Sequence, residues 1–184
     1  AVLLCGHGSR NTDYSKDLLR LKNKLRKKLK IVDFYHCFIE INDPGIEDIV
    51  RSVVNDYKNI YIFPLLLFEG KHMIQDIRNQ INYLSKVHKK KINLLEKISL
   101  IEDILPIIGK IIMSKTLPMP KAIITSCSFS KSEQVRITLE KYTEKLSKYL
   151  YIDKNFSHFV GEENDVLKKI KHNNLERENI LLHP

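Results

Sequence analysis

Short apolar runs alternate with longer amphipathic segments along the first 113 residues. The pattern predicts strands at 2–5, 32–41, 60–68 and 92–95, and helices at 13–30, 46–57, 73–88 and 101–113. The run YIFPLLLF is apolar throughout, which is typical of a strand that helices cover on both faces. This order indicates an α/β fold with a parallel sheet, and such sheets place ligands at the carboxyl ends of their strands.

The pattern restarts after a linker at 114–121, where two prolines interrupt it. Shifting the chain along itself by 120 positions places VLLCGHGS over AIITSCSF and IYIFP over ILLHP. This correspondence predicts an internal duplication, with a first lobe at 1–113 and a second at 122–184. The second lobe stops in its third strand, so we expect it to be incomplete and the chain to be a fragment of a longer protein.

Composition places the chain among globular proteins, with 43% hydrophobic and 29% charged residues. No apolar stretch is long enough to span a membrane, and the start lacks the features of a signal peptide. The three cysteines, Cys5, Cys37 and Cys127, are scattered and suit a reducing compartment. We therefore expect a cytoplasmic protein. The net charge of +9 favours an anionic partner, whether nucleic acid, membrane surface or small polyanion.

The first lobe carries candidate chemistry after each of its first three strands. His7 lies between two glycines after the first strand, Glu40 lies near the end of the second, and His72 follows the third. Because parallel strands end at one edge of a sheet, we expect these three side chains to converge. Two imidazoles and a carboxylate could bind zinc, hold a divalent ion loosely enough to pass it on, or accept protons.

The second lobe lacks this chemistry. At a shift of 120 positions, Cys127 corresponds to His7 and Val160 corresponds to Glu40, while His72 has no counterpart. We therefore expect the first lobe to hold the active site and the second to close its cleft.

Three segments, LLCGHGSR, FIEINDPGIEDIV and IFPLLLFEGKHMIQDI, resemble the class II tetrapyrrole chelatases, specifically the sirohydrochlorin cobaltochelatase or ferrochelatase (CbiX-like) kind. All three occur in the order and spacing of that family. The resemblance implies a lyase with two chelatase-like lobes that inserts a divalent metal into sirohydrochlorin, for cobalamin or sirohaem biosynthesis. It implies Co²⁺ as the preferred metal and Fe²⁺ as the other choice, with no organic cofactor.

The resemblance also implies roles for individual residues. His7 and His72 match the two histidines that bind the incoming metal and help to remove the pyrrole protons, and Glu40 matches an acidic residue of the same cleft. Sirohydrochlorin carries eight carboxylates, so Ser9 and Arg10 next to the site are candidates for substrate binding. The expected partners are sirohydrochlorin and the metal ion, without nucleic acid or membrane, and a homo-oligomer stays open.

Two other functions fit parts of the sequence. A histidine phosphatase also has a histidine after its first strand, which would make GHGSR a phosphate pocket, but position 6 is glycine where that chemistry usually needs arginine. A basic nucleic-acid-binding protein would explain the charge. However, the chain has no recognisable nucleic-acid-binding motif, and its basic run lacks interleaved aromatic residues.

Overall fold

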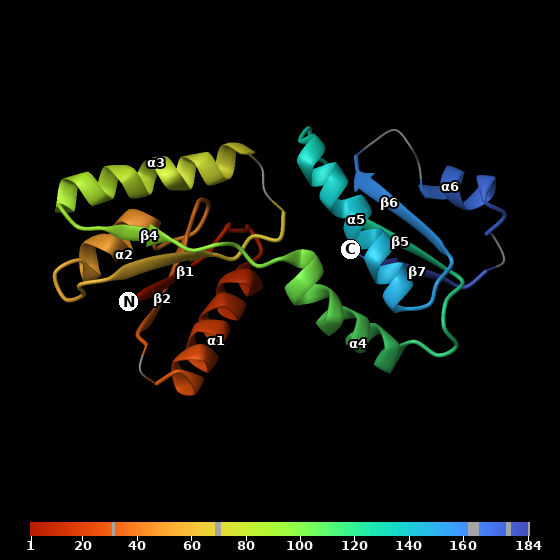
Figure 1. Cartoon of the computed structure of the whole chain (residues 1–184), viewed down its shortest axis with the longest axis horizontal. Helices are drawn as coiled ribbons and strands as arrows, with labels where there is room; N and C mark the ends of the chain where they lie inside the picture. The colour runs from red at the N-terminus through yellow and green to blue at the C-terminus, as the bar shows by residue number, and fades with distance from the viewer. Residues whose placement is uncertain (31, 69–70, 162–165, 176–177, 184) are drawn as a thin grey trace. The chain divides into compact units, whose positions relative to one another are not determined.

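The computed structural model of the chain contains two parallel sheets flanked by helices (Figure 1). It describes every residue except 31, 69–70, 162–165, 176–177 and 184, and the side chains of residues 71–73 also lie outside the described part. The chain divides into two compact units, one formed by Ala1–Leu67 and Lys71–Ile98 and the other by Phe68–Gly70 and Ser99–Pro184. The α/β architecture predicted from the sequence is confirmed.

The first unit is a four-stranded parallel sheet with helices on both faces. Its elements are β1 (Val2–Gly6), α1 (Thr12–Lys28), β2 (Phe34–Phe38), α2 (Ile46–Val53), β3 (Ile60–Pro64), α3 (Lys71–His88) and β4 (Ile92–Leu94). The strand order is β2-β1-β3-β4. Apolar side chains of α2 and α3 pack on one face, where Cys5 and Ile62 are fully buried, and α1 packs on the other face against Leu4 (Figure 1).

Two strands of the first unit end several residues earlier than the sequence predicted, and the strand expected at 92–95 ends one residue earlier, at Leu94. The strand expected at 60–68 ends at Pro64, which has no N–H to donate, and Leu65 makes the last backbone bond by donating to Cys5 O at 2.8 Å. The strand expected at 32–41 spans Phe34–Phe38, because the chain turns out of the sheet at Ile41, whose φ is +70°. The second of these strands also begins two residues later than predicted, at Phe34. The early ends of both strands lie at the carboxyl edge, where they leave loops free to carry functional side chains.

The second unit is a three-stranded parallel sheet of order β6-β5-β7. Its elements are a π-helical turn (Leu100–Ile104), α4 (Leu105–Lys115), β5 (Ala122–Ser128), α5 (Glu133–Tyr149), β6 (Lys154–Val160), α6 (Val166–His172) and β7 (Ile180–His183). We predicted 101–113 as the last helix of the first lobe. Instead, α4 belongs to the second unit, because Leu105 and Ile112 pack into one core with Leu146 of α5.

The two units repeat one topology, with a register that differs from the predicted one. In the first unit, Leu18 of α1 and Phe38 of β2 lie in one hydrophobic cluster. Their counterparts 121 positions later, Leu139 of α5 and Phe159 of β6, lie in one cluster of the second unit. The strand register is the same in both units, because Val2 pairs with Phe34 and Ile123 pairs with Asn155, each 32 positions on, so the shift is set by the packing of Leu18 and Phe38. The third strand differs by one residue: Val2 also pairs with Tyr61, whereas its counterpart Ile123 pairs with Leu181. Tyr61 and Leu181 are 120 positions apart, so this strand keeps the predicted shift of 120.

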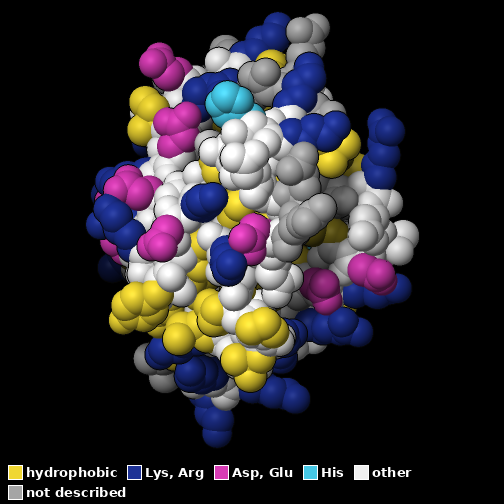
Figure 2. Space-filling view, turned by 90° about the vertical axis from the view of Figure 1, so that its right-hand side faces the viewer, with side chains coloured by type: hydrophobic (Ala, Val, Ile, Leu, Met, Phe, Trp, Pro, Cys, Tyr) yellow, Lys and Arg dark blue, Asp and Glu magenta, His cyan; other side chains and the backbone are white. Residues whose placement is uncertain are grey.

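In the described part of the chain, no helix combines the length and apolar character needed to cross a membrane. The face shown in Figure 2 carries Lys and Arg side chains interspersed with Asp and Glu, and hydrophobic side chains gather on its lower part. On this face the positive charge is therefore spread among acidic groups.

Candidate functional site

The carboxyl ends of β1 and β2 bring two of the predicted site residues together. Beyond the strands, the pairing continues for two more backbone bonds: Ile39 N–H donates to Gly6 O at 2.9 Å, and Glu40 N–H donates to His7 O at 3.1 Å. These bonds hold the loop after β1 beside the loop after β2. As a result, His7 and Glu40 are neighbours at one edge of the sheet, as predicted from their positions after adjacent strands.

The side chains of His7 and Glu40 form a close pair. Nε2 of His7 lies 3.1 Å from Oε1 of Glu40, and the two side chains are 37% and 57% exposed. The other ring nitrogen, Nδ1, lies 3.1 Å from the carbonyl oxygen of Gly8. With a proton on Nδ1 donated to that carbonyl, Nε2 faces the carboxylate and can hold either a proton or a metal ion there.

Gly8 allows the two loops to approach each other. Its φ is +106°, and a Cβ atom at this position would lie 1.8 Å from the carbonyl oxygen of Glu40. A side chain is therefore excluded by both the backbone conformation and the neighbouring loop. Tyr14 of α1 supports the same loop from the other side, because its hydroxyl accepts the N–H of His7 at 3.0 Å.

Asn42 is a site residue that the sequence analysis did not identify. Its Oδ1 accepts the N–H of Ser9 at 2.6 Å, which ties the loop after β2 to the loop after β1. In the sequence, Asn42 stands only within the segment FIEINDPGIEDIV, without an assigned role. The feature that could have indicated its role is the preference of Asn for turns, in which its side chain bonds to nearby backbone groups.

The two predicted substrate-binding residues lie next to this pair. Ser9 accepts the N–H of Asn11 on its Oγ at 3.1 Å, and its own hydroxyl hydrogen remains for a further acceptor. Arg10 is exposed. Their contact with a substrate stays a prediction.

The third predicted ligand, His72, is outside the described side chains. Its backbone lies in the first turn of α3, which follows β3, but its position relative to His7 is not described. Among the described residues, no group of three His, Cys, Asp or Glu side chains is close enough to hold a metal ion. The described part of the site is therefore the pair formed by His7 and Glu40.

Two of the cysteines are core residues of the first unit. Cys5 and Cys37 are fully buried and face each other in the β1–β2 register. A hydrogen bond with Cys5 and burial both raise the pKa of the Cys37 thiol. A buried thiol that keeps its proton is a poor metal ligand, so the candidate metal-binding groups described at this edge are an imidazole and a carboxylate.

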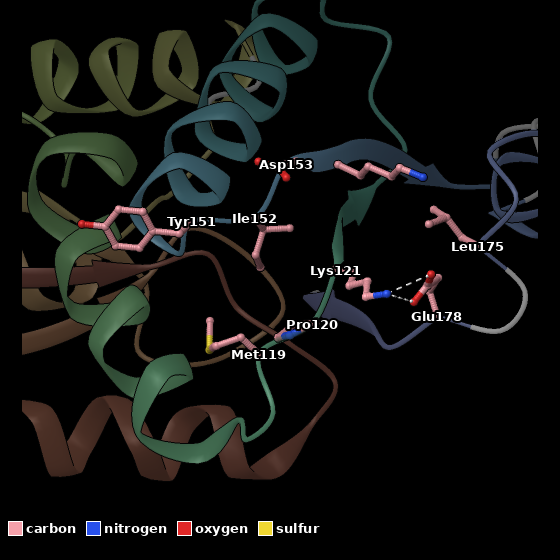
Figure 3. A pocket seen from close by; sticks show the side chains of 9 residues that line it. Met119, Pro120, Lys121, Tyr151, Ile152, Asp153, Leu175 and Glu178 are labelled. Carbon is pink, nitrogen blue, oxygen red and sulfur yellow. Dashed lines mark hydrogen bonds and ion pairs between the residues drawn. The ribbon is translucent and has the colours of Figure 1, made fainter.

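A cavity of about 330 Å³ lies in the second unit (Figure 3). It is lined by Met119, Pro120, Lys121, Tyr151, Ile152, Asp153, Lys154, Leu175 and Glu178. Lys121 immediately precedes β5, Asp153 immediately precedes β6, and Lys121 is paired with Glu178 at 3.0 Å. The cavity is thus at the amino ends of β5 and β6. In the first unit, His7 and Glu40 instead follow the carboxyl ends of their strands.

Comparisons with known proteins agree with this fold. The model of the CbiX family matches residues 1–113. Among solved structures, SirB from Bacillus subtilis with Fe³⁺ has a TM-score of 0.83 and 16% identity, covering 98% of this chain and 74% of that one. The sirohydrochlorin chelatase SirB from Bacillus subtilis subspecies spizizenii in complex with cobalt has a TM-score of 0.73 and 16% identity, covering 98% and 85%. No match was found among curated protein sequences.

Proposed function

Because the chain belongs to the CbiX family, we propose that it is a sirohydrochlorin chelatase, which inserts a divalent metal ion into the tetrapyrrole sirohydrochlorin. The observation that carries the proposal is the pair of His7 Nε2 and Glu40 Oε1, 3.1 Å apart and partly exposed at the carboxyl edge of the sheet. The solved structures with similar folds support it, since one is described as a sirohydrochlorin chelatase in complex with cobalt.

Metal insertion needs ligands that bind the ion and then release it. The His7 and Glu40 side chains are both partly exposed, which gives the ion a route in and out. In the proposal, His72 completes the metal-binding set with His7, and Co²⁺ is the preferred ion with Fe²⁺ as the second choice. The pathway served is the synthesis of cobalamin or sirohaem.

The pair of His7 and Glu40 can also accept the protons that metal insertion releases. Insertion displaces two pyrrole N–H protons, and a neutral imidazole or a carboxylate can accept them. When the metal ion leaves the space between Nε2 of His7 and Glu40, that space can take a proton instead, because Nδ1 of the ring is held by Gly8 O in either state. In the proposal, Ser9 and Arg10 bind peripheral carboxylates of the macrocycle.

The test is the absorbance of sirohydrochlorin mixed with Co²⁺, and separately with Fe²⁺, with and without the protein. We expect a metal-dependent spectral change that the parent accelerates. We expect His7→Ala, His72→Ala and Glu40→Gln to slow it by about 10²- to 10⁴-fold, the usual contribution of a positioned acid–base group.

His172→Ala is the matched control, because His172 is an exposed histidine on α6 in the second unit. It should react at the parent rate. A folded parent that gives no acceleration with either metal, or His7→Ala at the parent rate, would contradict the proposal.

A further inference from the structure

The loops that carry His7 and Glu40 are joined by a series of hydrogen bonds that ends in a side chain. The first two bonds are backbone bonds, from Ile39 N–H to Gly6 O and from Glu40 N–H to His7 O. The third bond runs in the opposite direction: the N–H of Ser9, on the first loop, donates to Oδ1 of Asn42 at 2.6 Å. A side-chain amide thus takes over where the backbone of the second loop leaves the sheet.

The backbone leaves the sheet through a strained turn at Ile41. Asn42 N–H donates to Glu40 O at 2.8 Å, two residues back, and the residue between them has a φ of +70°. These two features describe a γ-turn with a positive central φ, a rare and strained conformation. A β-branched residue is unfavourable there, so the contacts on either side of Ile41 must hold the turn in place.

Those contacts come from the first loop. The carbonyl oxygen of Glu40 lies so close to Gly8 that a Cβ atom would not fit between them. Asn42 adds the hydrogen bond to Ser9 on the other side of the turn. The side chain of Glu40, by contrast, is 57% exposed, so little packing around it fixes its distance from His7.

From this arrangement we propose that Asn42 is a positioning residue, which clamps the loop of His7 to the loop of Glu40 and thereby sets the separation of their metal-binding atoms. Ligands that are already held in place lose less conformational freedom when the ion binds. Removing the clamp should therefore weaken binding of the ion without removing a ligand. The inference rests on the proposed function, because it takes His7 and Glu40 as metal ligands.

The test is a titration of the full chain with Co²⁺ alone, without tetrapyrrole, followed by calorimetry. Asn42→Ala removes the acceptor, and we expect its Co²⁺ affinity to fall by about tenfold, as is usual when a partner that orients a metal ligand is lost. Amide hydrogen exchange at Ser9 should become faster in the same variant. Asn42→Asp keeps an acceptor oxygen and should restore both properties at high salt, where its added charge is screened.

Asn93→Ala is the matched control, because Asn93 is also half-buried and makes one side-chain hydrogen bond to backbone, to Ile60 O at 3.4 Å at the amino end of β3. It should bind Co²⁺ like the parent. A parent that binds Co²⁺ together with an Asn42→Ala variant of equal affinity would overturn the positioning role alone. An Asn42→Asp variant as weak as Asn42→Ala would overturn it as well. A parent that binds no Co²⁺ would overturn the proposed metal site and this inference with it.

Discussion

Gly8 is the residue of the site that tolerates substitution least. A methyl group there would lie 1.8 Å from the carbonyl oxygen of Glu40, and φ is +106°. We expect Gly8→Ala to lower the free energy of unfolding by about 3 kcal/mol or more, because backbone strain adds to steric overlap. Urea unfolding followed by circular dichroism measures this change.

Gly161 provides a control that separates the two effects. Its φ is +96°, but the nearest atom to a built Cβ is Phe129 Cβ at an ordinary 3.9 Å. Gly161→Ala should therefore show the strain alone, about 1–2 kcal/mol. If the two variants lose equal stability, the close approach of the two loops is not what requires glycine at position 8.

At the same scale, part of the site could be predicted from the sequence and part could not. His7 and Glu40 each follow an apolar run, and adjacent parallel strands end at one edge, so their proximity follows from the pattern. The role of Asn42 depends on the turn at Ile41. A β-branched residue argues against a positive φ, so only the three-dimensional contacts of the turn show where Asn42 points.

Among the elements, α4 and α5 cross where one glycine lies in a helix. A Cβ atom on Gly109 would lie 2.4 Å from Cδ1 of the Tyr149 ring. Alanine is the better helix former by about 1 kcal/mol. We nevertheless expect Gly109→Ala to destabilise the chain by about 1–3 kcal/mol, because the helices or the ring must move apart. Thermal unfolding gives the sign directly.

A second background tests the cause. In a Tyr149→Ala chain the overlap is absent, so Gly109→Ala should become neutral or stabilising there. Equal losses in both backgrounds would show that contact with the tyrosine ring is not the reason for glycine.

The elements also show why the predicted repeat was displaced by one residue. Polarity alone does not separate a shift of 120 from one of 121, because Ile123 and Ile124 are both apolar. The packing of each residue against its helix separates them: Val2 packs in the cluster of Leu18 on α1, and Ile123, which is 121 positions later, packs in the cluster of Leu146 on α5. The caps carried a usable signal, since Asn11 and Ser132 are the residues before α1 and α5 and differ by 121 positions.

The corrected register alters the second copy's counterparts but not the conclusion drawn from them. At a shift of 121, Ser128 corresponds to His7 and Gly161 corresponds to Glu40. Neither can bind a metal as an imidazole or a carboxylate does. The imidazole–carboxylate pair therefore belongs to the carboxyl edge of the first sheet. The equivalent positions of the second sheet carry a serine and a glycine.

On the scale of the whole molecule, each unit contains a histidine whose pKa is lowered by burial. Burial lowers the pKa of His36 on β2, and Lys22 lowers it further. Burial also lowers the pKa of His183 on β7, whose Nε2 lies 3.0 Å from the Tyr142 hydroxyl. Burial raises the pKa of Tyr142 to about 12, so this hydroxyl keeps its proton and can donate it to neutral His183.

These shifts predict that both units lose stability in mild acid. The ordinary histidine pKa is 6.5, and the folded values lie below it, so the unfolded chain takes up protons first as the pH falls. The stabilisation is fully present above about pH 6.5 and is lost as the pH falls through the folded pKa. Urea unfolding of the parent at pH 7.5 and at pH 5.5, roughly one unit either side of that value, should show the lower free energy at the lower pH.

Two variants assign the effect to the units. His183→Phe removes the titrating group of the second unit and His36→Phe that of the first, so each should reduce the difference between the two pH values, and the double variant should reduce it most. Since His36 lies beside Phe38 in the first unit and His183 lies beside Tyr142 in the second, their effects should add. A parent equally stable at both pH values, or a double variant that keeps the parent's full decline, would show that these two side chains do not couple folding to protonation.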